Sequence, residues 1–281
     1  MRYGIVASSG TARQVVDLAV EAERAGWDGF FTWDGVSIGP LDTWDPWAVL
    51  AAAAVRTERV TLGALVVAVP RRRAWDLARQ ALTVDHLSGG RLVLPVGVGA
   101  VDDRAFAGVP GQVTALRDRA EALDEVLAFL DQAWTGEPFD AEGPHVTAHR
   151  MQFLPRPVQR PRVPVWPVAA WPSASSLDRA ARFEGVVPQL RGERGFEPLA
   201  AQDVAALCTD LAQRRAAVGR TGEFDVVVQG VTDDADPGAS RVRLSALADA
   251  GATWWVEARW DPVSATPDAL LTRVRQGPPG P

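Results

Sequence analysis

The sequence predicts an α/β fold, a (β/α)8 TIM barrel that forms a single domain. Apolar runs of strand length alternate with helices, and eight such strand–helix units can be counted along the chain. The strands are apolar on both faces, which is typical of a parallel sheet covered by helices. A length of 281 residues is typical of one closed barrel. An open doubly wound sheet rarely alternates so regularly, so we prefer the closed barrel.

The first half of the chain supplies four strands. We expect them over residues 3–7, 29–33, 60–67 and 92–98. Helices that are amphipathic or largely apolar follow them, over residues 12–25, 46–55, 74–87 and 113–134. Thr11 can cap the first helix and Gly26 can end it.

An insertion separates the fourth and fifth strands. Residues 135–162 are rich in Gly and Pro, and they could hold a small hairpin. The remaining strands are expected over residues 163–169, 185–189, 224–229 and 253–258, and the remaining helices over 173–183, 199–217, 239–250 and 267–275. The barrel domain then covers residues 1–276, and we expect the Gly/Pro tail, residues 277–281, to be flexible.

Composition excludes several classes of function. A net charge of −6 argues against nucleic acid or an anionic membrane surface as a partner. No apolar run reaches the roughly 18 residues of a transmembrane helix. The first strand begins near Arg2, which leaves no room for a signal peptide, and the single Cys208 excludes an internal disulfide. These features predict a cytoplasmic protein.

The types of residue that are missing narrow the chemistry further. All 29 basic residues are Arg, so Schiff-base chemistry and the P-loop lysine are excluded. His145 and His149 have a spacing that could suit a metal, but no Glu or Cys joins them in a ligand pattern. We therefore expect no metal site. Cys208 lies on an expected helix and is interpreted as a small buried apolar residue rather than a nucleophile.

Ligands of such barrels bind at the carboxyl ends of the strands. The residues expected there are rich in Trp, Gly and small side chains, which suits a flat aromatic ligand. They include Trp33, Asp34, Gly35, Leu65, Val66, Gly97, Gly99, Ala170, Trp171, Ser173, Gln189, Gln229, Glu257, Arg259 and Trp260.

Four segments together resemble a known family. They read AERAGWDGFFTWD, DPWAVLAAAAVRTERVTLGALVVAVPRR, LSGGRLVLPVGVG and FLPRPVQRPRVPVW. Their combination resembles the bacterial luciferase-like family of flavin-dependent oxidoreductases, from Tyr3 to about Trp255. The resemblance implies a barrel that binds reduced flavin mononucleotide (FMN) or a deazaflavin at its rim and commonly forms a homodimer. Some members of that family add oxygen to a substrate, and others transfer a hydride.

The resemblance also implies which residues hold the cofactor. The unusual peptide that lies beside the flavin ring in the family would fall at Leu65–Val66, and Gly97 and Gly99 would line the ring. The cofactor phosphate would bind at Ala170, Trp171 and Ser173, where backbone N–H groups at a helix start receive the anion.

Three positions depart from the family pattern. Gly35 stands where many relatives have a His, and Ala100 stands where deazaflavin dehydrogenases have a carboxylate. Both differences count against proton transfer of the dehydrogenase kind. Ala169-Ala170 also occupies places where glycines are usual.

Several rim residues have two interpretations. Asp34 either caps the following loop or orients a ligand in catalysis, and Trp33 either stacks on the flavin or fills the barrel mouth. The run Arg71-Arg72-Arg73 either binds a phosphate or is a solvated helix start. Asp102 and Asp103 either supply a general base or cap the loop that follows.

These observations favour a flavin-dependent monooxygenase that uses reduced FMN and oxygen on a small organic substrate. Asp34 would orient the substrate or a water, Trp33 and Trp171 would wall the ring, and Ser173 would bind the phosphate. The chain lacks a nicotinamide-binding fingerprint, so a separate reductase would supply the reduced flavin. Two alternatives remain: deazaflavin-dependent hydride transfer, and a non-catalytic barrel, which Gly35 and Ala100 would suit.

Overall fold

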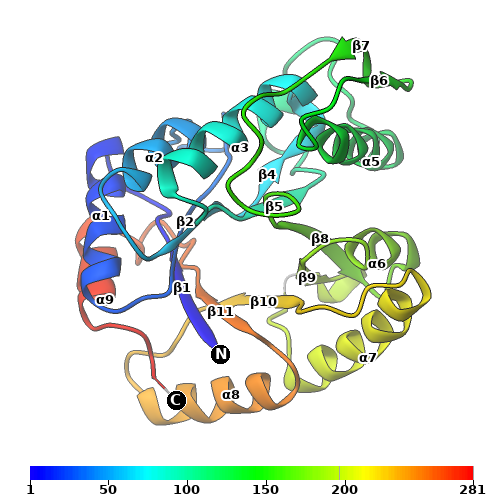
Figure 1. The fold of residues 1–281 in the computed structure, drawn as a ribbon. Coiled ribbons are helices and arrows are strands. Elements are labelled where there is room, and N and C mark those ends of the chain that lie inside the picture. The colour runs from blue at the N-terminus through cyan, green and yellow to red at the C-terminus, as the bar shows by residue number, and fades with distance from the viewer. Residues whose placement is uncertain (196, 281) are drawn as a thin grey trace.

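A computed structural model describes residues 1–195 and 197–280 of the chain. Its parallel strands form one sheet with helices packed around the outside (Figure 1). Along the sheet the order is β3-β2-β1-β11-β10-β9-β8-β5-β4. The strands are β1 (Arg2–Val6), β2 (Gly29–Thr32), β3 (Thr61–Ala64), β4 (Val67–Ala68), β5 (Leu94–Gly97), β8 (Val165–Trp171), β9 (Gly185–Leu190), β10 (Asp225–Gly230) and β11 (Trp254–Glu257).

The two ends of this order meet in one segment of chain, because β3 and β4 follow each other directly. β3 pairs with β2 and β4 pairs with β5, and a bridge joins Leu62 to Leu92. Within the described residues the sheet is therefore a nearly closed barrel with eight strand positions. The predicted fold class is confirmed.

Two strand boundaries differ from the prediction. The third strand is not continuous over residues 60–67, because it is interrupted at Leu65–Val66, where the peptide bond is cis. The fifth strand, β8, ends at Trp171 rather than at Ala169. Ala170 and Trp171 consequently belong to the strand and pair with residues of β9.

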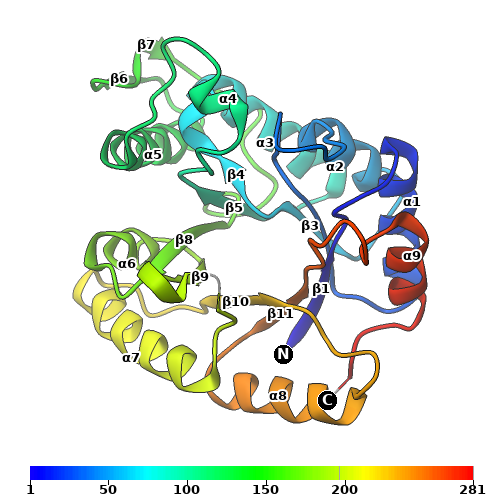
Figure 2. The same ribbon diagram turned by 180° about the vertical axis from the view of Figure 1, so that it is seen from behind.

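The expected helices form the outer layer, which Figure 2 shows from behind. They are α1 (Ala12–Arg24), α2 (Pro46–Ala54), α3 (Ala74–Ser88), α5 (Leu116–Ala133), α6 (Ala174–Ala180), α7 (Ala201–Ala217), α8 (Pro237–Asp249) and α9 (Pro267–Arg275). Three short elements add to these: α4 (Arg104–Ala107) and the 3₁₀ helices η1 (Val69–Arg71) and η2 (Gly192–Arg194). Thr11 caps α1 as expected, by accepting a hydrogen bond from the Gln14 amide. No helix in the part that the structure describes has the length and apolar character to span a membrane.

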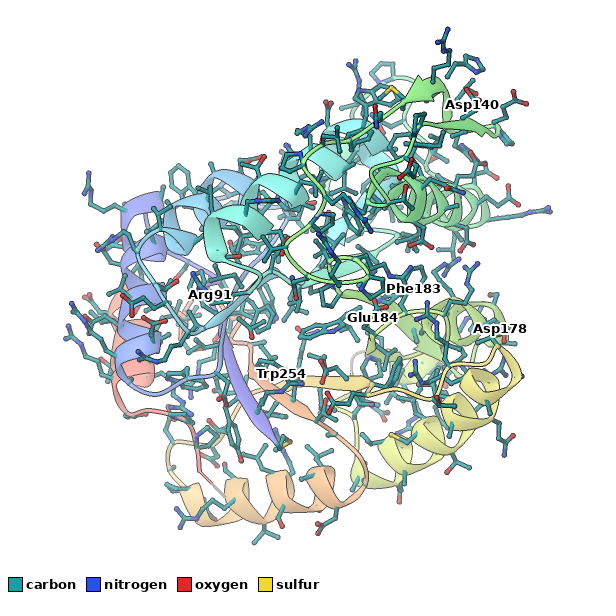
Figure 3. All side chains as sticks on the ribbon, in the orientation of Figure 1. Arg91, Asp140, Asp178, Phe183, Glu184 and Trp254 are labelled. Carbon is teal, nitrogen blue, oxygen red and sulfur yellow. The ribbon has the colours of Figure 1, made fainter. Side chains whose placement is uncertain are left out.

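The predicted insertion contains an antiparallel hairpin of β6 (Phe139–Glu142) and β7 (Thr147–Met151). The hairpin projects beside α5, with Asp140 at its edge (Figure 3). Phe139 packs against Phe129 of α5 with ring centroids 5.0 Å apart. The hairpin thus packs on the outer layer, away from the barrel interior.

Large aromatic side chains fill the part of the barrel that lies toward the amino ends of the strands. Phe31, Trp166 and Trp254 are fully buried there, and their ring centroids lie 5.7–6.1 Å apart. Glycines face them: a Cβ atom on Gly29 would lie 2.8 Å from Trp254, and one on Gly185 would lie 2.5 Å from Trp166. Such distances are too short for a real Cβ atom, so the rings take the volume that larger residues would need. The interior is packed at this level, and open space is confined to the barrel mouth.

The tail was expected to be flexible. The backbone amide of Gly277 donates to Val274, and Arg273 donates to the carbonyl of Gly277. Pro281 lies outside the described residues. Flexibility of residues 277–281 stays a prediction.

Candidate functional site

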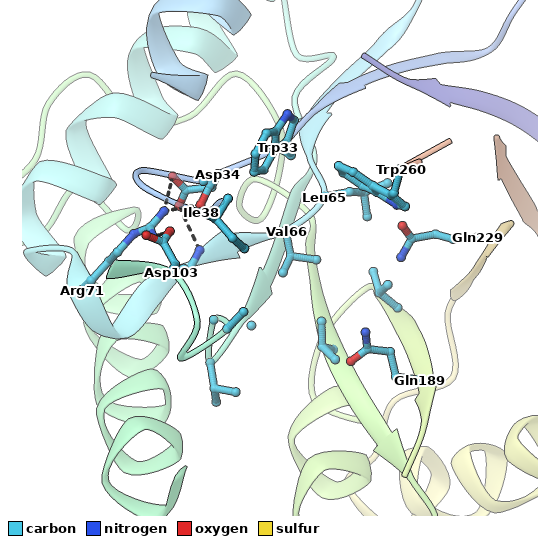
Figure 4. Close-up of a pocket in the computed structure, with 18 residues that line it drawn as sticks. Trp33, Asp34, Ile38, Leu65, Val66, Arg71, Asp103, Gln189, Gln229 and Trp260 are labelled. Atoms are coloured by element: carbon cyan, nitrogen blue, oxygen red, sulfur yellow. Dashed lines mark hydrogen bonds and ion pairs between the residues drawn. The ribbon is translucent and has the colours of Figure 1, made fainter. Parts of the chain in front are cut away.

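A cavity of about 370 Å³ opens at the carboxyl ends of the strands (Figure 4). This volume lies within the range of small-molecule sites, roughly 300–1,000 Å³. Six residues predicted for the site line it together: Trp33, Asp34, Leu65, Val66, Gly97 and Gly99. The other lining residues are Gly35, Ile38, Ala68, Arg71, Val98, Ala100, Asp103, Val168, Val187, Gln189, Gln229 and Trp260.

One wall of the cavity is formed by Leu65–Val66 and the loop after β5, which lie side by side. A Cβ atom on Gly97 would lie 3.1 Å from the Val66 side chain. Gly99 has φ +76°, and a Cβ atom there would lie 2.6 Å from Phe106. The two glycines therefore let this loop pack closely against its neighbours, and they add no side chain of their own to the wall.

A buried arginine fixes the loop after β5 that contains Gly97 and Gly99, which we call the glycine loop. Arg119 of α5 donates to the carbonyl oxygens of Val98 at 2.9 Å and Gly99 at 2.5 Å. Its guanidinium also lies over the ring of Phe106, 5.4 Å from the centroid. This role could not be predicted from the sequence, because Arg119 lies on an ordinary amphipathic helix about 20 residues later.

Asp34 does not present a free carboxylate to the cavity. Its side chain is 0% exposed, and it accepts a hydrogen bond from the Ala68 amide at 2.9 Å. Arg72 binds both carboxylate oxygens, at 3.0 and 2.5 Å, and Arg71 approaches one of them at 2.7 Å. These contacts are those of a residue that anchors β4 and η1. The catalytic role predicted for Asp34 stays a prediction.

Asp103 completes the same cluster. It accepts hydrogen bonds from the amides of Val36, Ser37 and Ala105, each at 3.0 Å, and from Arg71 at 2.5 Å. Burial alone would raise the pKa of Asp103, but these donors bring it below its ordinary value. The carboxylate caps α4 and ties the loop after β2 to the loop after β5. Of the two predicted roles for Asp103, its contacts are those of a cap.

The three arginines after β4 lie in two different environments. The side chains of Arg71 and Arg72 are only 5% and 16% exposed, and both are ion-paired with Asp34. Arg73 is exposed and directly precedes α3, as expected for a solvated helix start. A run of like charges gives no sign that buried carboxylates lie opposite its first two members, and phosphate binding by this run stays a prediction.

Two tryptophans wall the cavity opposite the glycine loop. Trp33 and Trp260 meet edge to face, with ring centroids 5.7 Å apart and planes at 83°. A Cβ atom on Gly35 would lie 2.1 Å from the ring of Trp33. The indole thus fills the space where the resemblance places a His in relatives, and Gly35 is the residue that allows it.

Two carboxamides also face the cavity, Gln189 from β9 and Gln229 from β10 (Figure 4). Both stood on the predicted rim, but neither was assigned to the site. The signal that could have found them is their shared place as polar residues that end two otherwise apolar strands.

The three residues predicted to bind a phosphate lie beside the cavity and not in its lining. Ala170 and Trp171 are on β8, and the Ala170 amide donates to Ser176 Oγ at 3.1 Å. Ser173 directly precedes α6 and is half-buried, with its hydroxyl 3.4 Å from Ser175 Oγ. A phosphate site at Ala170, Trp171 and Ser173 remains a prediction.

Metal ligands and nucleophiles are not gathered in the described residues. In residues 1–195 and 197–280, no group of three or more His, Cys, Asp or Glu could hold a metal ion. His149 lies on the hairpin, 3.8 Å from Asp140. Burial raises the pKa of the Cys208 thiol on α7, which keeps it protonated at neutral pH.

Comparison with known proteins gives the family. Residues 2–236 match the family model of the luciferase-like monooxygenases, and the chain belongs to this family. It is 30% identical to an F420-dependent glucose-6-phosphate dehydrogenase of Intrasporangium calvum over 173 residues, 57% of this chain and 49% of the relative. It is 34% identical to a 4-hydroxyprotoasukamycin monooxygenase of Streptomyces nodosus subsp. asukaensis over 116 residues, 41% of this chain and 31% of that one. The chain thus aligns with about half the length, or less, of these curated relatives. The family predicted from the sequence motifs is confirmed.

Solved structures share the fold. The F420-dependent tetrahydromethanopterin reductase of Methanopyrus kandleri superimposes with a TM-score of 0.78 at 17% identity, covering 98% of this chain and 96% of that one. A monooxygenase of Streptomyces bottropensis gives a TM-score of 0.76 at 18% identity, covering 98% and 97%. These similarities extend over nearly the whole barrel, and at such low identity they concern the fold alone.

Proposed function

We propose that this protein is a flavin-dependent oxidoreductase, a monooxygenase that uses reduced FMN and oxygen on a small organic substrate. The observation that carries the proposal is the cavity itself. It combines a wall of apolar side chains and glycines at Leu65–Val66, Gly97 and Gly99 with charged groups that are paired to one another.

The residues of the cavity fit a planar tricyclic cofactor. The two glycines add no side chain to the wall, and Val168 and Val187 supply an apolar floor. A bound reduced flavin would supply the electrons for the reaction with oxygen. The protein would hold the ring, exclude water and orient the substrate.

The absence of a free acid or base in the described lining favours oxygen chemistry over alcohol oxidation. Hydride removal from an alcohol requires a base that takes the hydroxyl proton. Asp34 and Asp103 are the carboxylates in the described lining, and both are held by Arg71. Gly35 and Ala100 offer no ionisable group in their place.

A deazaflavin-dependent hydride transfer is the second candidate. Relatives named as F420-dependent dehydrogenases support it. A separate reductase and a homodimer remain part of the leading proposal, as does the phosphate site around Ser173. A cytoplasmic location is likewise proposed.

Anaerobic titration tests the choice of cofactor. Purified protein is titrated with reduced FMN and with reduced F420, and binding is followed by cofactor fluorescence and by the melting temperature. We expect tighter binding of reduced FMN, and oxygen uptake when air is admitted. Tighter binding of F420 would favour the second candidate, and binding of neither would support the non-catalytic barrel.

A pair of glycine variants locates the binding. Gly97→Val fills the space beside Val66 and should weaken flavin binding at least tenfold, because its side chain enters the cavity wall. Gly222→Ala is the matched control, since a Cβ atom there meets nothing within 4 Å. Equal flavin affinities of the two variants would mean that the flavin does not bind against this wall.

A further inference from the structure

The strands opposite the glycine loop supply a second, different half of the cavity. Gln189, Gln229 and Trp260 come from the ends of β9, β10 and β11, and Figure 4 shows them across from Asp34, Arg71 and Asp103. β9 and β10 pair with Val186 opposite Val226, and the same register continued by three residues puts Gln189 opposite Gln229. The two side chains therefore leave neighbouring strands at the same level.

These carboxamides are available to a ligand. No hydrogen bond from either side chain to a described residue is present, although polar side chains elsewhere on the rim are bonded. Each carboxamide carries two N–H donors and one carbonyl acceptor. Together they can bind one polar group that both donates and accepts.

The charges of the cavity are already neutralised. Arg71 and Arg72 face Asp34 and Asp103, two cations against two anions, and the four side chains are 0–16% exposed. An ionised substrate would therefore find no unpaired counter-ion among the described lining residues, whereas a neutral substrate needs none.

We propose that the cavity selects an uncharged, planar substrate that carries a carbonyl, amide or hydroxyl group. Gln189 and Gln229 bind the polar group, and the ring of Trp260 packs against the planar part. This inference rests on the proposed function, since the flavin would occupy the glycine side of the cavity. It excludes phosphate esters and carboxylates from the same position.

A cation beside the cavity gives the rival explanation. Arg243 lines an adjoining hollow that shares Gln189, Gln229 and Trp260 with the cavity. Its guanidinium lies 4.7 Å from the ring of Trp255 and donates a hydrogen bond of 3.2 Å to the Val231 carbonyl. An anionic substrate that reached across to this side chain would contradict the proposal. The experiment therefore includes Arg243.

A matched pair of probes tests the charge preference. Calorimetric titration with 2-naphthamide and with 2-naphthoate compares a neutral and an anionic ligand of nearly the same shape, on protein with and without reduced FMN. We expect the amide to bind at least tenfold more tightly. Equal affinities, or tighter binding of naphthoate that Arg243→Gln abolishes, would overturn the proposal.

Substitution of the carboxamides tests their role. Gln189→Leu and Gln229→Leu should each weaken the binding of 2-naphthamide by roughly two- to tenfold, as expected for a lost neutral hydrogen bond. Gln132→Leu on the exposed face of α5 is the matched control, and melting curves confirm folding of all three variants. Unchanged affinity for the amide in both cavity variants would overturn the assignment.

Flavin binding, measured on the same samples, separates the two hypotheses. If reduced FMN binds and the amide does not, the substrate class is wrong and the proposed function stands. If no flavin binds, the proposed function fails, and titration of the free cavity with the two probes still decides the charge preference.

Discussion

Asp34 and Asp103 lie on different loops, and Arg71 joins them. Asp34 follows β2, Asp103 follows β5, and Arg71 follows β4, so three neighbouring strand ends are fixed to one another. The ion pairs are nearly inaccessible to solvent, where removal of one partner leaves a buried charge uncompensated. At the scale of single residues, the shape of the cavity depends on these pairs.

Replacement of Asp34 should show this dependence. Asp34→Asn leaves the Arg72 guanidinium without its anion and Arg71 with Asp103 alone, and should lower the free energy of unfolding by about 3–5 kcal/mol. Asp17→Asn is the control, because the pair of Asp17 with Arg56 is about half exposed and such pairs contribute less than about 1 kcal/mol. Urea unfolding of both variants measures the difference. A loss of stability no greater than that of Asp17→Asn would mean that Asp34 is not an anchor.

The contribution of Asp103 should depend on pH. Its pKa is lowered on folding, so its stabilising effect is present above the ordinary aspartate value of about 3.9 and is lost as pH falls below it. We expect the difference in unfolding free energy between the natural protein and Asp103→Asn to be largest at pH 6–7 and to shrink below pH 4. Asp102→Asn, at the exposed neighbour, should show little difference at any pH. A difference for Asp103→Asn that stays constant from pH 7 to pH 3 would contradict the assignment.

At the scale of elements, the sequence predicts which segments are buried better than it predicts where they end. The apolar run of residues 60–69 marks a buried strand, but composition does not reveal its interruption at Leu65–Val66. The family motifs pointed to that peptide, and the structure has a cis bond there. β8 extends to Trp171 because its pairing with β9 continues, and strand pairing is a tertiary property.

The candidate site was predictable to a similar degree. Trp33, Trp260, Gly97 and Gly99 at the strand ends were placed on the rim from the chain order and do line the cavity, whereas Trp171 lies outside its lining. The partners of Asp34 could not, because Arg71 and Arg72 lie almost 40 residues later and only the turn of η1 directs them inward. Arg119 was missed for the same reason. Sequence patterns give burial and position, whereas pairing of buried charges depends on the final packing.

A glycine at position 99 should be required for stability, for two separate physical reasons. Its φ of +76° disfavours any side chain, and an added Cβ atom would also lie 2.6 Å from Phe106 and 2.9 Å from Ala68. Gly111 shares the first constraint, with φ +84°, but has no atom within 4 Å of its added Cβ. Gly111→Ala should therefore cost about 1 kcal/mol, and Gly99→Ala roughly 1–3 kcal/mol more, as expected for overpacking. Chemical unfolding compares the two. Equal costs would show that the loop has room beside Phe106.

At the scale of the whole molecule, side chains fill the barrel toward the amino ends of its strands, and the cavity opens at the carboxyl ends. Phe31, Trp166 and Trp254 fill this part of the interior, and glycines on the facing strands make room for them. The rings therefore act as a rigid support beneath the cavity. The closed sheet ties this support to every strand that carries a lining residue.

A double-mutant cycle should show that Gly29 and Trp254 are energetically coupled in the barrel interior. Gly29→Ala places a Cβ atom 2.8 Å from Trp254 and should cost about 1–3 kcal/mol by overpacking. Trp254→Phe removes the outer part of the indole that Gly29 faces, and by itself leaves a void. The double variant should be less destabilised than the sum of the single variants, with a coupling of about 0.5–3 kcal/mol, because each change relieves the other. Gly222→Ala combined with Trp254→Phe is the control and should be additive, since Gly222 faces open space. Additive costs for Gly29→Ala and Trp254→Phe would mean that the ring of Phe31, which lies 2.9 Å from the same added Cβ atom, limits the space at this strand rather than the indole.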